Sequence, residues 1–301
     1  MDVTLEDAWT KLRWSKKHFE SLRPEIEDFE HNDNHTISFE IHPEEGKYTF
    51  YVHGLDAPDE DWGLQLGDCI HNARAALDYL VVRLVALVTG KDPRDITRAG
   101  FPIESNPAKF ARFTSEAGTY PTFGNYLARI QELQPFNIGD PSIWGHDTNG
   151  LARDALIPAA LDRLSNLDNV DKHRVIHAVW AGIQFNLFDA FPNKPSSFRH
   201  VTSTLNPGAL ENDAEIGAMW FATPLPGEWH PKQMDMKRHF RIQVALDEAL
   251  PYKGVLEAVP FCLWGVEAVL KIFEPVFTQG TAPLPVTAVP DPDLAHTPRV
   301  R

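Results

Sequence analysis

The chain has 301 residues, of which 43% are hydrophobic, and its 42 acidic against 28 basic side chains give a formal net charge of -14. This composition is typical of a globular protein with a sizeable core, and the negative charge disfavours non-specific attraction to nucleic acid or to an anionic membrane. Only two cysteines occur, Cys69 and Cys262, and both lie in apolar helical patterns, which indicates buried thiols in a reducing compartment and argues against a disulfide framework.

The first third of the sequence predicts a helix, a hairpin and a second, longer helix. Residues 4–30 carry apolar side chains at helical spacing, and Pro24 should loosen or end that helix. Residues 35–54 alternate apolar and polar side chains on either side of a short turn, which is the pattern of a two-stranded hairpin. Residues 61–88 then predict the long central helix, which Gly90 should end.

The remaining sequence predicts further helices and a set of strands. The pattern weakens over 91–158, where two short helices lie among prolines and glycines. A helix follows over 159–181, and 182–248 favours three or four antiparallel strands, which we expect to join the early hairpin in one sheet. A last amphipathic helix is expected over 253–277, and the proline-rich residues 280–301 predict a disordered tail.

Because strands flank the helices in the sequence, we expect a single α+β domain over 1–279, a helical bundle packed with an antiparallel β-sheet. In that domain the helical core covers about 60–181, the sheet draws on 35–54 and 182–248, and 253–277 forms the closing helix. The N-terminus has no apolar signal core, and no apolar run is long enough to span a bilayer. We therefore expect a cytoplasmic protein with no membrane partner.

One edge of the central helix is polar for two turns and aliphatic beyond them. At about 100° per residue, Gly67, His71, Arg74 and Asp78 fall within a narrow arc, and valines continue the same arc. We expect this edge to face the interior along its whole length. Its polar half must then find hydrogen-bonding or charged partners.

The helix over 159–181 supplies candidate partners. Asp171 falls in the middle of its leucine-rich face, where a carboxylate is costly unless a cation meets it, and Arg174 borders that face. Arg74 is the nearest candidate cation on the central helix, although its partner could equally be Asp78. We therefore expect the two helices to lie side by side, with Arg74, Asp78, Asp171 and Arg174 in one charged network.

Two interpretations of this network stay open. Paired buried charges commonly fix the packing of helices without doing chemistry. Alternatively, the network lines a pocket in which His71 or His173 acts as a general acid or base. On that second interpretation the candidate catalytic residues are His71, Arg74, Asp78, Asp171, Lys172, His173 and Arg174.

A metal site is a further alternative, with Asp68, His71, His173 and His177 as candidate ligands. His173 and His177 stand one helical turn apart and could reach one ion from one face, while Asp68 and His71 form a DxxH pair on the central helix. The glutamates of carboxylate-bridged bundle sites are missing, as is the HExxH pattern of zinc proteases. No Walker A loop, GxGxxG loop or GxSxG elbow occurs, so the sequence implies no cofactor.

The stretches GDCIHNARAALDYL (67–80) and LSNLDNVDKHRVIH (164–177) resemble a group of uncharacterised bacterial proteins with a GD-x-x-HN-x-R-x-x-LD helix and a later DKHR helix. This resemblance spans roughly residues 60–180 and implies no particular activity. More distantly, the arrangement is similar to HEPN domains, helical bundles many of which are metal-independent ribonucleases. Their signature is an arginine shortly before a histidine, and its match here, Arg13 with His18, has a tryptophan where a polar residue usually follows the arginine.

We expect a binding or interaction protein of unknown partner, in which the charged network is structural. The first alternative, implied by the HEPN resemblance, is a metal-independent ribonuclease with His173 as acid or base. In that enzyme Arg74 and Arg174 would hold the phosphate, and Asp78 and Asp171 would orient them. A helical-bundle metal site is the second alternative. The partner is accordingly expected to be RNA or a protein, and the chain could form an oligomer.

Overall fold

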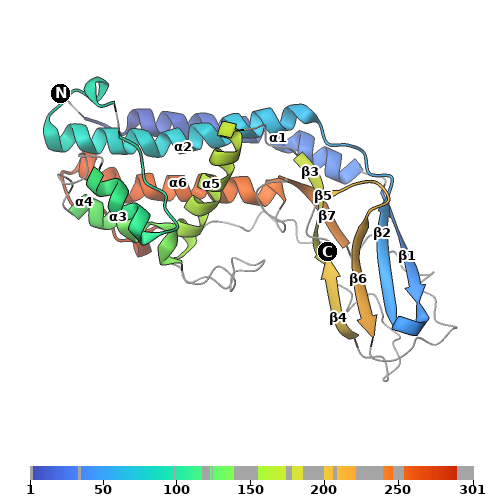
Figure 1. Ribbon diagram of the computed structural model, residues 1–301. Coiled ribbons are helices and arrows are strands. Elements are labelled where there is room, and N and C mark those ends of the chain that lie inside the picture. The colour runs from blue at the N-terminus through green and yellow to red at the C-terminus, as the bar shows by residue number, and fades with distance from the viewer. Residues whose placement is uncertain are drawn as a thin grey trace. The chain divides into compact units, whose positions relative to one another are not determined.

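The computed structural model of this protein describes residues 3–32, 35–97, 99–116, 123, 125–138, 155–173, 178–185, 200–205, 209–221, 240–246 and 254–289. Its fold is α+β, as the sequence predicts (Figure 1). The helices are α1 (Glu6–Asn32), α2 (Glu60–Thr89), α3 (Pro107–Glu116), α4 (Asn125–Glu132), α5 (Leu156–His173) and α6 (Val255–Thr278). The strands are β1 (Thr36–His42), β2 (Lys47–His53), β3 (Ala178–Phe185), β4 (His200–Leu205), β5 (Ala209–Leu210), β6 (Glu215–Phe221) and β7 (Phe240–Leu246). Within the described ranges, none of the helices combines the length and the apolar character that crossing a membrane requires.

The chain divides into two compact units. Unit 1 comprises residues 1–22, 64–176 and 257–301, and unit 2 comprises residues 23–63 and 177–256. The helices α3, α4 and α5 belong to unit 1, and the described strands belong to unit 2. That residues 1–279 form one domain stays a prediction.

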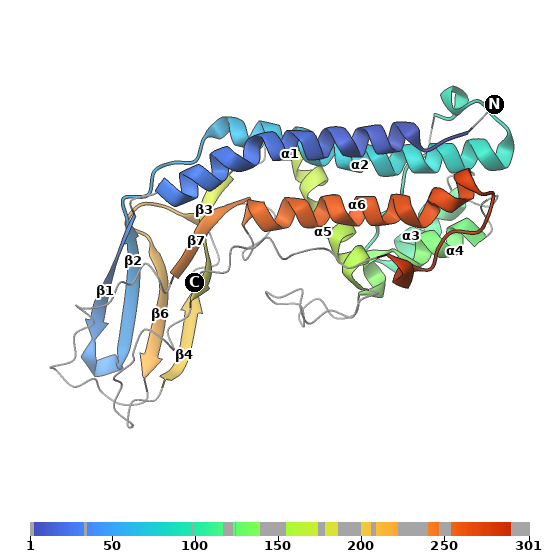
Figure 2. The ribbon, with the colours of Figure 1, turned by 180° about the vertical axis from the view of Figure 1, so that it is seen from behind.

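Unit 1 is a helical bundle, and α2 is its long central helix. The unit 1 parts of α1, α2 and α6 run alongside one another, and α5 crosses them (Figure 1, Figure 2). Ser15 of α1 donates a 2.6 Å hydrogen bond to the backbone oxygen of Cys69 in α2. Gly265 of α6 lies so close to α5 that a Cβ added there would come within 2.4 Å of the Cβ of Ala160. Gly90 ends α2 in the left-handed conformation, at φ 68°, that a helix C-terminus favours.

The first helix continues through Pro24, although the sequence predicted that the proline would loosen or end it. α1 runs without interruption to Asn32. A proline inside a helix costs about 3 kcal/mol, because it removes one backbone hydrogen bond and its ring crowds the preceding turn. Leu22 and Ile26, on either side of it, are both buried. Since each such side chain contributes about 1.5–3 kcal/mol on burial, their packing offsets the cost of the proline.

The predicted helix over 159–181 is wrong at its C-terminal end. α5 ends at His173, and Ala178 begins strand β3, which pairs with β7. Trp180 of that strand stacks on Phe29 at 5.1 Å between ring centroids and donates a 2.6 Å hydrogen bond to the backbone oxygen of Asp56. All three residues belong to unit 2, so distant contacts decide the conformation of a segment whose local pattern is helical.

The strands that are described in unit 2 form two antiparallel sheets, with the orders β1-β2-β6-β4 and β5-β3-β7. The β1–β2 hairpin is confirmed, and Gly46 occupies its turn at φ 59°. The prediction of a single sheet is wrong, because the hairpin extends through β6 and β4 while β3 pairs with β5 and β7. Alternating hydrophobicity identifies a strand and its buried face, but it does not identify the neighbouring strand.

Part of the predicted tail has a defined path. The backbone N–H of Leu284 donates a 2.9 Å hydrogen bond to the oxygen of Ile272 in α6, and Val289 is buried. A few apolar side chains between prolines are enough to hold this segment, because proline loses little conformational entropy on ordering. Residues 290–301, the rest of the predicted tail, lie outside the described residues.

Candidate functional site

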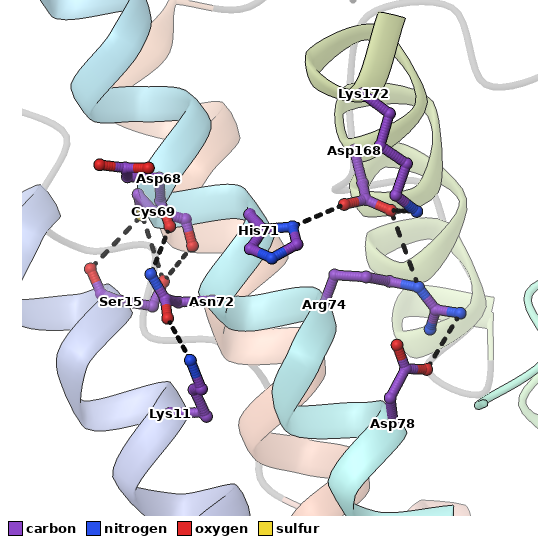
Figure 3. A network of polar contacts seen from close by, with 10 residues as sticks. All are labelled: Lys11, Ser15, Asp68, Cys69, His71, Asn72, Arg74, Asp78, Asp168 and Lys172. Carbon is purple, nitrogen blue, oxygen red and sulfur yellow. Dashed lines mark hydrogen bonds and ion pairs between the residues drawn. The ribbon is translucent and has the colours of Figure 1, made fainter. Parts of the chain in front are cut away.

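Four of the candidate residues, His71, Arg74, Asp78 and Lys172, meet around Asp168, which the sequence did not predict, where α2 and α5 cross. His71, Arg74 and Asp78 come from successive turns of α2, and Asp168 and Lys172 come from α5 (Figure 3). We refer to these five residues as the Asp168 network. All of them belong to unit 1.

Asp168 is the buried centre of this network, with a side chain that is only 2% exposed. Its Oδ2 lies 2.5 Å from Lys172 Nζ and 3.9 Å from Arg74 Nε. Its Oδ1 lies 3.8 Å from Nδ1 of His71, whose side chain is 59% exposed, and accepts no hydrogen bond from the described residues. A buried carboxylate without compensation is costly, so the cations around Asp168 stabilise its place in the interface.

Arg74 and Asp78 hold the backbone of Phe101 between them. Arg74 Nη2 donates to the Phe101 oxygen at 2.5 Å, and the Phe101 N–H donates to Asp78 Oδ1 at 2.8 Å. The two side chains also approach each other, with 3.3 Å between Arg74 Nη2 and Asp78 Oδ1. Gly100 leaves room for this contact, since an added Cβ would lie 3.3 Å from the same oxygen. One helical turn of α2 thus fixes the segment that leads to α3.

Burial raises the pKa of Asp78 above its ordinary value, while the Arg74 guanidinium and the hydrogen bond from Phe101 act in the opposite direction. The raised pKa indicates that desolvation of this carboxylate exceeds the compensation it receives. Asp78 is therefore held in place by the fold at a cost in electrostatic free energy.

The carboxylate of α5 that meets Arg74 is that of Asp168, and not that of Asp171 as the sequence predicted. Asp168 stands one turn after Leu164 and two turns after Leu161, both fully buried, so it shares their face of α5. Asp171 instead lies over Gly67, where an added Cβ would come within 2.1 Å of its Oδ1. The buried leucines determine the rotation of α5 and hence which aspartate enters the interface.

Asp171 lies among other carboxylates. Burial raises its pKa, His71 lowers it, and the negative charges of Asp168 and Asp68 raise it further. Asp68 is exposed on the adjacent turn of α2, and Asp171 is partly exposed. These two residues, which we call the acidic face, place negative charge beside the Asp168 network.

Three of the predicted site residues receive no structural assignment. Arg174 and His177 lie outside the described residues, and the side chain of His173 is not described either. Among the residues that are described, no three His, Cys, Asp or Glu side chains are grouped so that they could hold a metal ion. The metal site with Asp68, His71, His173 and His177 therefore stays a prediction.

Sequence reasoning did not assign a role to Asn72, which connects α2 to α1. Its side-chain oxygen accepts a 3.0 Å hydrogen bond from Lys11 Nζ, and its amide donates to the Asp68 oxygen at 2.7 Å (Figure 3). An asparagine inside a long helix is itself a signal, because this residue is unfavourable there unless its side chain bonds nearby groups.

The Asp168 network is suited to either of two roles. In a structural role, its charge pairs hold α2, α5 and the Phe101 segment together. In a catalytic role, it orients His71 for proton transfer. No protein-family model, curated protein or solved structure gives a significant match to this chain. The resemblance to the bacterial GD-x-x-HN group and to HEPN domains stays a prediction, and the proposals below rest on the residues themselves.

Proposed function

We propose that this protein is a binding protein, in which the Asp168 network has a structural role and fixes the packing of α2 and α5, and the acidic face binds a positively charged segment of a partner protein. The observation that carries the proposal is the balance of charge around Asp168. Arg74 and Lys172 each lie against a carboxylate. Neither is a free cation of the kind that phosphate recognition needs.

The structural role of the network follows from burial. Asp168 is 2% exposed and Arg74 is 17% exposed, so removal of either partner leaves a poorly hydrated charge. Such a loss typically costs about 3–5 kcal/mol. Arg74 also bonds the Phe101 backbone, so the same residue ties α5 and the segment before α3 to α2. These links define one arrangement of the helices and leave the exposed surface beside them well ordered.

The binding role follows from the excess of negative over positive side chains in and beside the Asp168 network. Among the described residues here, the four carboxylates of Asp68, Asp78, Asp168 and Asp171 lie beside the two cations Arg74 and Lys172. Burial raises the pKa of Asp171 and the neighbouring carboxylates Asp168 and Asp68 raise it further, and a bound ammonium or guanidinium group relieves the repulsion among these carboxylates. Electrostatic complementarity of this kind guides encounter with a basic partner and is sensitive to salt.

The test is calorimetric titration of the full-length protein with an oligolysine peptide at low and at high salt. Asp68→Asn with Asp171→Asn should weaken binding roughly tenfold at low salt, because two favourable charge contacts are lost. Asp92→Asn with Asp95→Asn is the matched control, since it removes the same charge from another part of unit 1. Equal weakening by both pairs, or no binding at low salt, would contradict the acidic face as the binding site.

A second candidate function, metal-independent RNA cleavage, is favoured by one feature of the network. The free oxygen of Asp168 faces Nδ1 of His71, which leaves the other ring nitrogen of an exposed histidine available for proton transfer. We infer that His71 would be the acid or base of such an enzyme, with Asp168 orienting it. The earlier assignment to His173 and Arg174 stays a prediction.

Cleavage of single-stranded RNA in EDTA decides between the two functions. A ribonuclease should lose about 10²-fold or more of its activity on His71→Ala, while the melting temperature stays unchanged because the ring is exposed. His18→Ala is the control, since His18 lies on α1, where its ring contacts Trp14. Absence of cleavage by the wild-type protein supports the binding function, and equal activity of both variants points to a contaminating nuclease.

A further inference from the structure

Ser38, His53 and Asp213 form a hydrogen-bonded chain in unit 2. Ser38 Oγ lies 2.6 Å from Nε2 of His53, and Nδ1 of the same ring lies 2.5 Å from Oδ1 of Asp213. The serine and the aspartate therefore occupy opposite nitrogens of one imidazole. This is the order of groups, hydroxyl to base and base to carboxylate, on which nucleophilic serine catalysis depends.

The β1–β2 hairpin brings the serine and the histidine together. Ser38 pairs with Tyr51 and His53 pairs with Thr36, so Ser38 and His53 are diagonal neighbours on one face of the hairpin. The alternate residues Phe50 and Val52 of β2 are fully buried. The face with Ser38 and His53 is thus the outward face, where a substrate can reach the hydroxyl.

The turn before β6 supplies the aspartate. The Asp213 N–H donates to the Val52 oxygen at 2.8 Å, and the Val52 N–H donates to the Ala214 oxygen at 3.1 Å. The side chain of Asn212 accepts a hydrogen bond from the N–H of Gly54 at 2.5 Å. These bonds fasten the turn to the end of β2, directly beside His53. The position of the Asp213 carboxylate is consequently set by the backbone and not by a flexible ion pair alone.

Asp213 has a positive φ of 64°, alone among the described residues other than glycine. A side chain in this left-handed conformation carries a strain of about 1–3 kcal/mol unless its surroundings hold it there. Aspartate tolerates the conformation better than most residues, but glycine would be free of the strain. Strained positions of this kind are concentrated at functional sites, and here the conformation serves to aim the carboxylate at the imidazole.

The Asp213 carboxylate also determines which nitrogen of the neutral His53 ring carries the proton. An ionised aspartate can only accept hydrogen bonds, so Nδ1 carries the proton of a neutral His53. Nε2 then has a free lone pair and accepts the hydrogen bond from the Ser38 hydroxyl. The neutral ring is therefore in the tautomer that can remove the serine proton.

We propose that Ser38, His53 and Asp213 form a nucleophilic site that cleaves small carboxylic esters. Ser38 Oγ attacks the ester carbonyl carbon while its proton moves to His53 Nε2. The bond from this carbon to the alcohol oxygen breaks, and the departing alcohol takes the proton from Nε2. Water then attacks the acyl-serine with the same histidine as base, which releases the carboxylic acid and restores Ser38. Asp213 is a positioning residue that stabilises the protonated ring.

The surroundings of Ser38 favour neutral or cationic esters over anionic ones. Tyr51 lies directly opposite Ser38, and its hydroxyl donates a 3.3 Å hydrogen bond to Glu40. Glu215 of β6 pairs with Tyr51 from the other side, so carboxylates flank the aromatic ring. In addition, β1 is the outermost strand in the described order of its sheet, and alternate N–H groups of an edge strand face away from the neighbouring strand. Such groups can donate to the oxyanion that forms on attack.

The experiment measures hydrolysis of p-nitrophenyl acetate by the full-length protein, together with covalent labelling by a fluorophosphonate. Mass spectrometry should find the label on Ser38. Ser38→Ala should abolish labelling, and His53→Gln should lower both rates by roughly 10²-fold, which is the lower end for loss of a general base. Asp213→Asn should also slow hydrolysis, whereas Asp213→Glu should retain part of the activity and the wild-type pH profile.

Matched controls separate this site from general reactivity of the surface. His42→Gln removes a different histidine of the hairpin, one that lies in β1 at 4.0 Å from Glu40, and Ser115→Ala removes an exposed serine of α3. Both should leave the rates unchanged, and circular dichroism should show that each variant is folded. Labelling at another residue, equal losses in His42→Gln and His53→Gln, or an unchanged rate in Ser38→Ala would overturn the proposal. Because Ser38, His53 and Asp213 belong to unit 2, the outcome for this site does not depend on the acidic face of unit 1.

Discussion

Asp168 and His71 face each other with 3.8 Å between Oδ1 and Nδ1, although the aspartate side chain is 2% exposed and the histidine side chain is 59% exposed. One member of the pair, Asp168, thus lies inside the α2–α5 interface, and the other, His71, lies at the surface of that interface. Substitution of the two residues should have very different consequences, because one is surrounded by protein and the other largely by water.

Asp168→Asn should lower the free energy of unfolding by about 3 kcal/mol, because the poorly hydrated Arg74 then keeps only Asp78 as a negative partner. Urea unfolding followed by circular dichroism measures this loss. Asp162→Asn is the control on the same helix, since its hydrogen bonds to Ser105 and Asn166 are near the surface. A loss of less than about 0.5 kcal/mol for Asp168→Asn would mean that this carboxylate is hydrated and that the network does not fix the packing.

Asp171→Asn should stabilise the protein at neutral pH and have no effect at low pH. Burial and neighbouring carboxylates raise the pKa of Asp171 in the folded state, so folding favours its protonated form. That stabilising contribution is complete below the unfolded pKa, about 4, and is lost as the pH rises through the folded value. Melting temperatures of both proteins between about pH 3 and pH 7 test the sign. A variant less stable than wild type at pH 7 would show that Asp171 is stabilised by a cation.

Gly265→Ala should destabilise unit 1, although alanine is the better helix former. The new Cβ would lie 2.4 Å from the Cβ of Ala160, and this overlap forces α5 and α6 apart. We expect a loss of about 1–3 kcal/mol, typical of overpacking, where an unhindered helical site would gain about 0.5–1 kcal/mol. Adding Ala160→Gly should recover part of the loss, which a double-mutant cycle in urea measures. Strict additivity of the two changes would contradict the contact.

Cys69 and Cys262 should not react with thiol reagents in the native protein at pH 8. Burial raises the pKa of Cys69 to about 11 and that of Cys262 to about 12, so almost no thiolate forms. Reaction with Ellman's reagent should begin only when denaturant unfolds the chain, and then at both cysteines. Rapid reaction of either thiol without denaturant would show that its helix opens locally.

The helical periodicity of the central helix identifies a polar edge, but the expectation that this edge faces the interior along its whole length is wrong, because the side chain of His71 is 59% exposed and Val88 is 39% exposed. His71, Arg74 and Asp78 do lie together against α5, because residues one turn apart on a helix must share a face. Helical spacing around Cys69 and Cys262 likewise predicts burial, which both cysteines have. The alternation over 35–54 predicts the β1–β2 hairpin for the same reason, since strand geometry is local.

The partners across each interface are decided by the tertiary structure. Leu161 and Leu164 set the rotation of α5, and this rotation brings Asp168 to Arg74 and leaves Asp171 beside Gly67. Neither the Phe101 backbone nor the end of α5 at His173 has a periodic signal, because both depend on contacts with residues far away in the chain.

The Ser38–His53–Asp213 chain illustrates the same division between local pattern and tertiary contact. The hairpin register places Ser38 beside His53, and that much follows from strands joined by a short turn. Asp213, however, is 160 residues from His53 in the sequence and reaches it only because β6 pairs with β2. The sequence alone determined which residues share a face of a helix or strand, since backbone geometry repeats along the chain. Only the tertiary structure decided which faces meet, since packing joins residues without any regular separation.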